Sequence, residues 1–453
     1  MTIPYSDKFD KITDRQNWAN DNQHICLLPY TSLQYFQLLK SVSPCCNLEQ
    51  TSKTDFLMPP NELKQTIQAG KDSLTDFLKP ITELRQAIES GNTYSKCNTC
   101  YQCESEGKIS ERTRYLIGIS DQQLSSLLED QTIDDDFYIH CTLSSLCNMA
   151  CRSCNSYTST LFSKVDSGRE ILLGTMSDHE NHWNSLLDSI VRETDRQENV
   201  TLVISGGEGS IQPDFHKLVD WLIDRNLSKK IKLTINTNGS IDDELLYQTL
   251  CNNFKKVSLS ISIDSINENY HYVRWPGSWQ KMHKNLKSFA NYQKQFKNFN
   301  FFLTPVWSIN NIFYLLDWVV FFESFNDENE LHLAAYDTPL WQPDWLDVQN
   351  LPGYIKKILV EKISPVLLNP WLIRNKTFHA NITNLIKLCT LQTDNQSNHY
   401  WEEYLQNTSK WDVRTNTNLE VHNKLLYDTM STEDTNLFLE LKEKAAMNYK
   451  PVT

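Results

Sequence analysis

The stretch Cys147-Asn-Met-Ala-Cys151-Arg-Ser-Cys154 places three cysteines within eight residues, directly after a strand-like segment at 137–143. A tetrahedral zinc site needs a fourth ligand that this stretch does not supply. Three thiolates can instead bind three irons of a [4Fe–4S] cluster and leave the fourth iron open to a substrate or cofactor. The spacing also differs from the C-x2-C-x2-C run of bacterial ferredoxins. We therefore predict a cluster site with an open iron; the alternatives are a zinc site and three buried thiols in a turn.

Strand-like and helix-like segments alternate from this stretch onward. The predicted strands are 137–143, 200–205, 231–236, 257–263, 299–306 and 331–335, and the predicted helices are 183–193, 215–224, 279–296 and 312–325. Such alternation predicts βα units around a parallel sheet. Six strands are fewer than the eight of a closed barrel, so we predict an α/β fold with an open, partial (β/α)6 TIM-like barrel over 137–345. The cysteines lie at the carboxyl end of its first strand, where barrel active sites lie.

The segments outside this barrel have a different character. We expect a loose arm at 1–20 and an irregular, cysteine-bearing region at 21–115. Two short helices, 61–67 and 81–90, are predicted within that region, because each has a proline before it and a glycine after it. The last region, 346–453, is polar and helical, and its expected packing anchors are Trp401, Tyr404 and Trp411.

Composition limits the class of protein. The chain has 453 residues, of which 40% are hydrophobic and 11% aromatic, so it can build real cores. Its net charge of −13 argues against a general binder of nucleic-acid phosphates. No apolar run reaches the roughly 20 residues of a membrane helix, and the N-terminus lacks the apolar stretch of a signal peptide. We therefore expect a soluble, cytoplasmic protein, in which 12 Cys indicate metal or redox chemistry more than disulfides.

Further motifs follow the later strands in a fixed order. Gly206-Gly207-Glu208 comes after the second strand, Asn236-Thr-Asn238-Gly after the third, and Ser262-Ile-Asp264 after the fourth, with Arg274 beyond them. Together with the cysteine stretch, this set resembles the radical SAM superfamily. More narrowly, the chain resembles the twitch-domain (SPASM/twitch-like) members, in which an auxiliary cysteine region precedes the barrel. The resemblance covers roughly residues 24–350.

The resemblance implies the cofactors and their ligands. A [4Fe–4S] cluster on Cys147, Cys151 and Cys154 would bind S-adenosylmethionine (SAM) and cleave it with one electron, giving methionine and a 5′-deoxyadenosyl radical that takes a hydrogen atom from the substrate. The implied SAM-binding residues are Gly206, Gly207 and Glu208 for the amino group, Ser262 and Arg274 for the carboxylate, and Asn236, Asn238 and Asp264 for the ribose and methionine. The alternatives are a surface salt bridge for Arg274 and turn chemistry for Asn236, Asn238 and Asp264. The chain departs from the family pattern at Gly209, where proline is usual, and at Ser153, where an apolar or aromatic residue is common.

The N-terminal cysteines resemble the auxiliary-cluster region of twitch proteins. The resemblance implies a second iron–sulfur cluster on Cys26, Cys45, Cys97 and Cys100, with Cys46 and Cys103 as reserve ligands. Lys40 stands where a glycine is usual, so the local hairpin can differ. The alternatives are a zinc ribbon-like site and free thiols. We expect three scattered cysteines, Cys141, Cys251 and Cys389, to be small core residues, and His179 and His182 to be solvated.

The functional prediction is a radical SAM oxidoreductase or modifying enzyme that acts on a peptide or protein. The alternative is dehydrogenation or epimerisation of a small molecule such as a sugar or aminocyclitol. A zinc-binding structural or adaptor protein is the non-enzyme alternative. The expected partners are the substrate and an electron donor such as flavodoxin or ferredoxin, with no membrane and no nucleic acid. No side chain is identified as a catalytic acid, base or hydrogen donor.

Overall fold

The computed structural model describes residues 32–36, 41–43, 83–105, 137–172, 174–340, 342–390 and 396–452, with isolated residues between 17 and 28 and between 110 and 116. The chain divides into two compact units. The first comprises Met1–Ser144, Leu173–Ser205 and Pro213–Leu233, and the second comprises Ser145–Leu172, Gly206–Gln212 and Thr234–Thr453. The residues predicted to bind the first cluster and SAM all belong to the second unit, and Cys26, Cys97 and Cys100 belong to the first.

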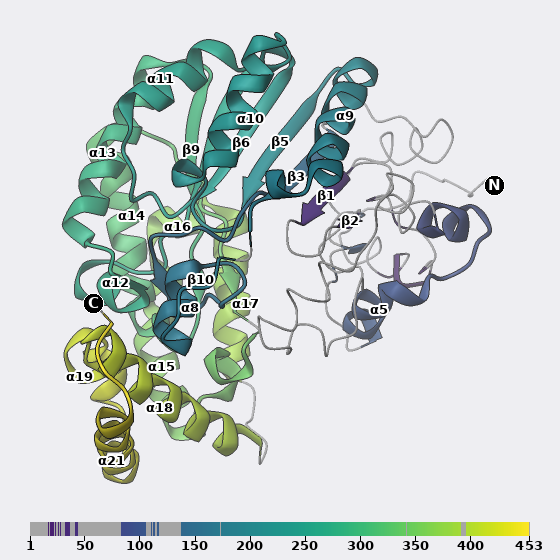
Figure 1. Cartoon of the computed structure of the whole chain (residues 1–453). Helices are drawn as coiled ribbons and strands as arrows, with labels where there is room; N and C mark the ends of the chain where they lie inside the picture. Colours follow the sequence, from purple (N-terminus) through teal and green to yellow (C-terminus); the bar gives the residue numbers. More distant parts are fainter. Residues whose placement is uncertain are drawn as a thin grey trace. The chain divides into compact units, whose positions relative to one another are not determined.

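A seven-stranded sheet with strand order β2-β1-β3-β5-β6-β7-β9 organises the fold (Figure 1). Its strands are β1 (Ser32–Phe36), β2 (Ser41–Ser43), β3 (Phe137–Thr142), β5 (Val200–Ser205), β6 (Ile231–Thr237), β7 (Lys256–Ile261) and β9 (Phe299–Leu303). The pairs β1–β3, β3–β5 and β7–β9 are parallel, and β2 is antiparallel to β1. The predicted α/β fold with a parallel central sheet is confirmed.

Burial explains why these segments form strands. The β5 residues from Val200 to Ile204 are all buried, as expected for a parallel strand that is covered on both faces. Strands β3, β6 and β9 alternate between buried and partly buried positions, which is the period of a strand with one more exposed face. In the β3–β5 register Thr142 pairs with Ser205, so these two strands end at the same level. The cysteine stretch leaves β3, and the Gly206-Gly207 turn leaves β5, from that edge.

Helices connect the strands. The first unit contains α5 (Asn98–Ser105), α9 (Glu180–Arg196) and α10 (Pro213–Asp224), and the second contains α8 (Thr160–Ser167), α11 (Glu244–Asn253), α12 (Asn267–Val273), α13 (Trp279–Gln295) and α14 (Leu315–Asn329). Helices α11, α13 and α14 lie side by side in Figure 1, and aromatic pairs join them. The Tyr247 and Phe289 ring centroids are 5.5 Å apart, and those of Trp279 and Phe321 are 4.9 Å apart.

The structure differs from the predicted elements in several places. The predicted strand 331–335 is wrong, because the chain there closes the end of α14: the Leu331 and Leu333 N–H groups donate to Asn326, and only Ala335 bridges to Leu303. The predicted strand 299–306 ends at Leu303, two residues before Pro305, which has no N–H for a ladder. Helices α11 and α12 and strands β1 and β2 were not predicted. Since β1 pairs with β3, the central sheet includes residues from the region predicted as 21–115.

The C-terminal region is helical, as predicted. Its helices are α15 (Gly353–Ile363), α16 (Pro370–Arg374), α17 (Lys376–Thr390), α18 (Gln396–Thr415), α19 (Leu419–His422), α20 (Lys424–Tyr427) and α21 (Thr432–Asn448). The expected anchors Trp401, Tyr404 and Trp411 are all buried on α18. Helix α18 packs against α21, and the Trp401 ring N–H donates to Asp434 at 3.0 Å.

Smaller predictions have mixed outcomes. A helix covers residues 83–89, within the predicted 81–90, whereas 61–67 lies outside the described residues. Cys141, Cys251 and Cys389 are buried, as expected, but His182 is buried at 1% exposure rather than solvated, because it faces Tyr35 of β1 at 5.7 Å. Within the described part of the chain, none of the helices is both long enough and apolar enough for a membrane span.

Candidate cofactor-binding site

The three predicted cluster cysteines lie on one loop between β3 and α8. Cys151 belongs to a two-residue strand, β4 (Ala150–Cys151), and the Cys154 N–H donates to the Cys151 carbonyl at 2.9 Å. The Ser159 hydroxyl caps α8 by accepting from the Phe162 N–H, and it donates to the Met149 carbonyl at 2.6 Å. The helix start therefore fixes the loop that carries all three thiols.

Burial makes these thiols weak acids. It raises the pKa of Cys147 to about 11, that of Cys151 to about 12 and that of Cys154 to about 11. Neighbouring thiols add to the rise: Cys154 acts on Cys147, Cys147 on Cys151, and Cys151 on Cys154. Because metal ligands must be thiolates, cluster binding at this loop has to displace protons.

The donor chemistry of the loop fits an iron–sulfur cluster. No three Cys, His, Asp or Glu side chains among the described residues stand in the arrangement of a metal site. The three thiols are nevertheless close enough to act on one another, and a cation is already directed at them: the Arg274 Nη1 donates to the Cys151 sulfur at 3.5 Å. Cys147, Cys151 and Cys154 would hold the cluster.

The Gly206-Gly207 turn fits closely against the cysteine loop. Both glycines have positive φ, 77° and 54°. A Cβ on Gly207 would lie 2.2 Å from the Leu146 carbonyl oxygen, so only glycine fits there. The Gly207 N–H donates to the Thr158 carbonyl at 3.1 Å, and the Glu208 N–H donates to the Leu146 carbonyl at 2.9 Å. Backbone contacts thus join the predicted SAM-binding turn to the predicted cluster loop.

Glu208 is fully buried and its carboxylate organises two turns. It accepts from the Thr237 hydroxyl at 2.8 and 2.9 Å, from the Asn238 N–H at 2.7 Å and from the Ser210 hydroxyl at 2.6 Å. The sequence prediction gave Glu208 to a ligand amino group; the structure gives both of its oxygens hydrogen bonds within the protein. Thr237 was missed, although it stands between the predicted Asn236 and Asn238.

Asparagine side chains connect the end of β6 to the cysteine loop. The Asn238 Nδ2 donates to the Asn148 Oδ1 at 2.8 Å, and the Asn148 Nδ2 donates to the Ser240 hydroxyl at 2.9 Å. Asn238 is buried, and Asn236 is partly buried within β6. Asn148 lies between the first two cysteines, and its position inside the motif was the signal that could have identified it.

Two predicted SAM-binding residues pair with each other. The Arg274 Nη2 lies 2.8 Å from the Asp264 Oδ2, and both side chains are buried. Burial acts to lower the pKa of Arg274, but the Asp264 charge and the Cys151 thiol raise it above its ordinary value, so the guanidinium stays cationic. Arg274 belongs to β8 (Arg274–Trp275) and is the antiparallel partner of Cys151. The buried pair differs from the surface salt bridge considered above.

Ser262 and a small cavity complete the surroundings. Ser262, the remaining predicted carboxylate ligand, is partly buried, and its N–H donates to the Thr237 carbonyl at 2.9 Å. A cavity of about 200 Å³ adjoins the cysteine loop and is lined by Asn148, Met149, Tyr270, Gly277, Lys281 and Met282, among others. The loop is therefore accessible from one side to a small ligand.

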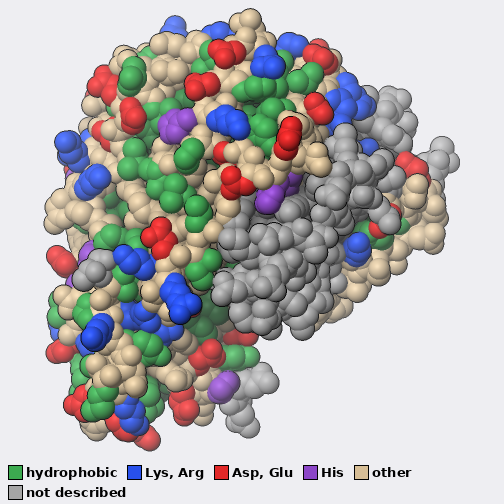
Figure 2. Space-filling view, in the orientation of Figure 1, with side chains coloured by type: hydrophobic (Ala, Val, Ile, Leu, Met, Phe, Trp, Pro, Cys, Tyr) green, Lys and Arg blue, Asp and Glu red, His purple; other side chains and the backbone are tan. Residues whose placement is uncertain are grey.

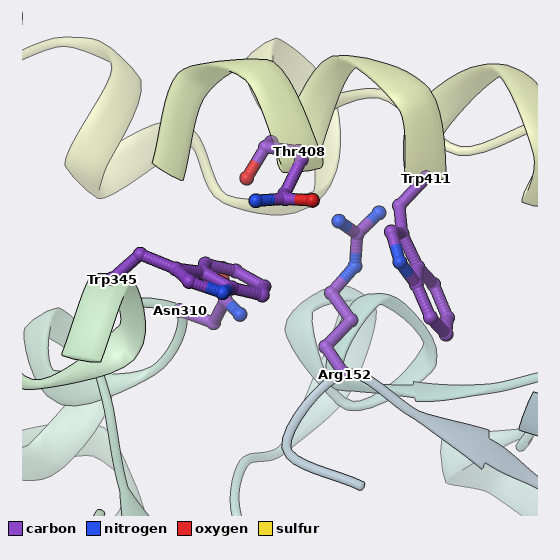
Figure 3. Close-up of a pocket in the computed structure, with 6 residues that line it drawn as sticks. Arg152, Asn310, Trp345, Thr408 and Trp411 are labelled. Atoms are coloured by element: carbon purple, nitrogen blue, oxygen red, sulfur yellow. The ribbon is translucent and has the colours of Figure 1, made fainter. Parts of the chain in front are cut away.

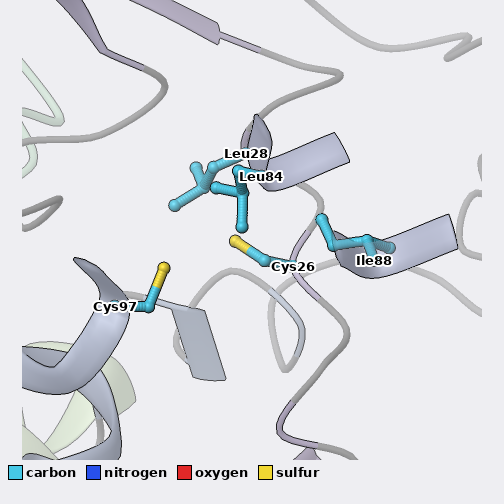
Figure 4. Packing of buried hydrophobic residues seen from close by; sticks show 5 residues of the cluster. All are labelled: Cys26, Leu28, Leu84, Ile88 and Cys97. Atoms are coloured by element: carbon cyan, nitrogen blue, oxygen red, sulfur yellow. The ribbon is translucent and has the colours of Figure 1, made fainter. Parts of the chain in front are cut away.

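The N-terminal cysteines form a separate group in the first unit. Cys26 and Cys97 are buried in a cluster with Leu28, Leu84 and Ile88, and their sulfur atoms point into the same space (Figure 4). Burial raises the pKa of Cys26 to about 12, and the thiols of Cys97 and Cys100 contribute to the rise. Cys100 is buried and Cys103 partly buried. Cys45 and Cys46 lie outside the described residues.

Comparisons with known proteins identify the domain. Residues 142–318 match the radical SAM superfamily. The chain thus contains a radical SAM domain, the domain of enzymes whose cofactors are a [4Fe–4S] cluster and SAM. None of the curated proteins is significantly similar to the chain.

Solved structures with distant similarity include native anSMEcpe with bound AdoMet, at 18% identity over 46% of this chain and 52% of that one, with a TM-score of 0.34. Streptococcus suis SuiB bound to precursor peptide SuiA is similar at 14% identity over 65% of this chain and 59% of that one, with a TM-score of 0.33. The chain spans about half the length of the first of these structures.

Proposed function

We propose that this chain is a radical SAM enzyme that modifies a peptide or protein. The observation that carries this proposal is that the parts of the site contact one another. Three thiols lie on one loop, a Gly-Gly-Glu turn is hydrogen-bonded to that loop, and the buried Arg274 guanidinium donates to the Cys151 sulfur. When bound, the cluster supplies one electron that breaks the sulfur–C5′ bond of SAM, giving methionine and a 5′-deoxyadenosyl radical that takes a hydrogen atom from the substrate.

The residues of the chain hold and orient these groups. Cys147, Cys151 and Cys154 are the cluster ligands. Gly206 and Gly207 allow a ligand to approach the backbone closely, and Glu208 fixes the turns after β5 and β6. Arg274 supplies a fixed positive charge beside Cys151 and a planar fork suited to a carboxylate. Asn236, Asn238, Ser262 and Asp264 are the remaining residues proposed for the SAM pocket.

The peptide substrate is the finer part of this proposal. Its support is the N-terminal cysteine group, since auxiliary clusters in similar enzymes often serve peptide modification. We propose that residues 21–115 form that auxiliary domain, that 137–345 form the partial barrel and that 346–453 form a helical extension. The proposed electron donor is flavodoxin or ferredoxin. The proposed location of the protein is the cytoplasm. The SuiB structure contains a precursor peptide; this observation describes SuiB and not the present chain.

The triple change of Cys147, Cys151 and Cys154 to Ala tests the reaction. We expect it to abolish 5′-deoxyadenosine formation under reducing, anaerobic conditions, measured by chromatography, while the same change at Cys141, Cys251 and Cys389 leaves SAM cleavage in place. SAM cleavage at the parent rate in the first variant would refute the assignment. A short precursor-peptide gene beside this one, whose product raises the cleavage rate, would support the peptide substrate over a sugar or aminocyclitol.

A further inference from the structure

Arg152 lies between the second and third cysteines and is buried, at 5% exposure. Its N–H donates to the Val273 carbonyl at 2.9 Å, and its Nε donates to the Tyr272 carbonyl at 2.9 Å. The guanidinium carbon lies 3.7 Å from the centre of the Tyr272 ring. Arg152 therefore points away from the thiols and joins the cysteine loop to the end of α12.

The charged end of Arg152 meets the C-terminal region. The Nη2 donates to the Asp412 Oδ1 at 2.6 Å and to the Thr417 hydroxyl at 2.9 Å. Figure 3 shows Arg152 reaching from the loop toward the helix that carries Thr408 and Trp411, with the guanidinium beside the Trp411 ring, 5.7 Å from its centre. The space left between these side chains is too small to hold a water molecule.

Asp412 is itself held rigidly. Its side chain is fully buried, and its second carboxylate oxygen accepts from the Leu419 N–H at 2.6 Å. The Thr417 hydroxyl also donates to Asp412 at 3.2 Å. The turn between α18 and α19 thus fixes the carboxylate, and the carboxylate fixes Arg152. A planar guanidinium with several directed donors suits this task better than the flexible ammonium of a lysine.

We propose that the C-terminal region positions the cluster loop through a clamp made of Arg152, Asp412 and Thr417. This inference rests on the proposed function, because it assumes that the loop binds a cluster. The loop is attached on one side by the pairing of Cys151 with Arg274, and the clamp attaches the next residue to α18. Arg152 is a positioning residue: it would set where Cys151 and Cys154 point, and its guanidinium donates to Tyr272, Asp412 and Thr417. Residues that orient metal ligands from behind change metal affinity by roughly 10- to 100-fold when they are altered.

The test measures how fast the loop loses iron. The parent is the full chain with Cys97 and Cys100 changed to Ala, so that the iron counted belongs to the loop. The variant carries Arg152→Gln with Asp412→Asn, which removes both fully buried charges; Lys442, whose Nζ lies 3.9 Å from the second Asp412 oxygen, keeps a charge that is partly exposed. An asparagine oxygen can still accept from the Leu419 N–H. The matched control is Lys410→Gln with Asp166→Asn, which removes a 2.8 Å ion pair that joins the same helix α18 to α8, away from the cysteine loop.

After anaerobic reconstitution, EDTA is added and the decay of the iron–sulfur absorbance is followed. We expect the clamp variant to lose its cluster roughly 10- to 100-fold faster than the parent, and the control pair to match the parent. Thermal unfolding of the metal-free proteins checks folding. Should the clamp variant fail to fold, Thr417→Val keeps both charges and removes one acceptor, and it should lose iron at an intermediate rate.

The outcomes separate the two proposals. Iron loss at the parent rate, in the folded clamp variant or in Thr417→Val, overturns the clamp and leaves the proposed function intact. A parent that binds no iron refutes the cluster site, and with it the proposed function. If the control pair loses its cluster as fast as the clamp variant, then the loss of any contact of α18 has the same effect. That result also overturns the specific role of Arg152.

Discussion

Arg274 contacts a predicted cluster ligand and a predicted SAM-binding carboxylate at the same time. One guanidinium nitrogen reaches the Cys151 sulfur at 3.5 Å, and another lies 2.8 Å from Asp264. Removing one partner of a buried ion pair leaves an unpaired charge and typically costs about 3–5 kcal/mol. The sequence identified Arg274 from its place after the fourth strand, but could not show that Asp264 would neutralise it.

The first prediction concerns SAM affinity. We expect Arg274→Ala to weaken SAM binding by roughly 10- to 150-fold, the effect of a lost charged hydrogen bond of about 1.5–3 kcal/mol. Glu208→Ala should weaken SAM binding as well, because the turns after β5 and β6 lose the carboxylate that joins them. Anaerobic calorimetry measures the affinity, and iron analysis checks that the cluster remains. Asp264→Asn is the comparison, because it removes the charge facing Arg274 and keeps the guanidinium. SAM affinity at the parent level in both alanine variants would mean that the pocket lies elsewhere.

The second prediction concerns Gly207. Gly207→Ala places a Cβ 2.2 Å from the Leu146 carbonyl at a φ of 54°, so we expect at least about 1–3 kcal/mol of lost stability and a displaced cysteine loop. Gly168 offers a control: its φ is 78°, but its Cβ would meet only the tip of the Arg414 side chain, at 3.0 Å. Denaturant unfolding and iron retention should both fall for Gly207→Ala, whereas Gly168→Ala should lower stability alone. Normal iron retention in Gly207→Ala would contradict the close fit.

At the scale of elements, the sequence predicts those strands and turns that neighbouring residues determine. The apolar run of β5 and the Gly-Gly turn after it were predictable, because apolar side chains favour a buried strand and glycine readily adopts positive φ. The strand expected at 331–335 failed, because Asn326 at the end of α14 takes the backbone groups that a sheet would need. Strand β1 was missed since its partner, β3, begins about a hundred residues later in the chain. The Arg152–Asp412 pair spans 260 residues, and nothing in the local sequence indicates it.

The third prediction concerns Asp347, the N-cap residue of the short helix η8 (Val348–Asn350). Burial raises the pKa of Asp347 to about 6, while hydrogen bonds from Gln349 lower it. The folded protein holds this proton more tightly than the unfolded chain, whose aspartate has a pKa of about 3.9. The stabilisation is therefore present below about pH 4 and is lost as the pH rises to about 6.

Asp347→Asn should consequently raise stability by about 2–3 kcal/mol at pH 7 and change little at pH 4, because asparagine keeps the cap acceptor without the charge. Thermal or denaturant unfolding across this pH range measures the difference. Asp220→Asn is the control, since Asp220 is an exposed aspartate of α10 with the same charge. An equal effect of Asp347→Asn at both pH values would exclude the buried carboxyl as its cause.

At the scale of the whole molecule, the two predicted cluster sites fall into different units of the chain. The cysteines of the second unit lie within residues 142–318, which match the radical SAM superfamily, and have a backbone-linked turn and a buried cation beside them. In the first unit, the thiols of the predicted ligands Cys97 and Cys100 contribute to the raised pKa of Cys26. The face drawn in Figure 2 carries basic side chains interspersed with acidic ones.

The last prediction is that the first unit binds its own cluster, mainly through Cys26, Cys45, Cys97 and Cys100. Four thiolates would saturate the cluster's irons, so this cluster should not bind SAM and would serve as an electron acceptor or substrate anchor. The protein with Cys147, Cys151 and Cys154 all changed to Ala isolates it. That variant should retain about four irons per chain and an iron–sulfur absorbance after anaerobic reconstitution.

Adding Cys97→Ala and Cys100→Ala to the same variant should remove this iron, whereas adding Cys251→Ala should not, because Cys251 is a buried cysteine of α11 in the other unit. Burial keeps the pKa of Cys26 near 12, so without a metal its thiol should react slowly with alkylating reagents at neutral pH. A colourless triple variant that contains zinc or no metal would refute the auxiliary cluster. The N-terminal region would then be structural, and the peptide substrate would lose its main support while SAM cleavage at the cysteine loop would not be affected.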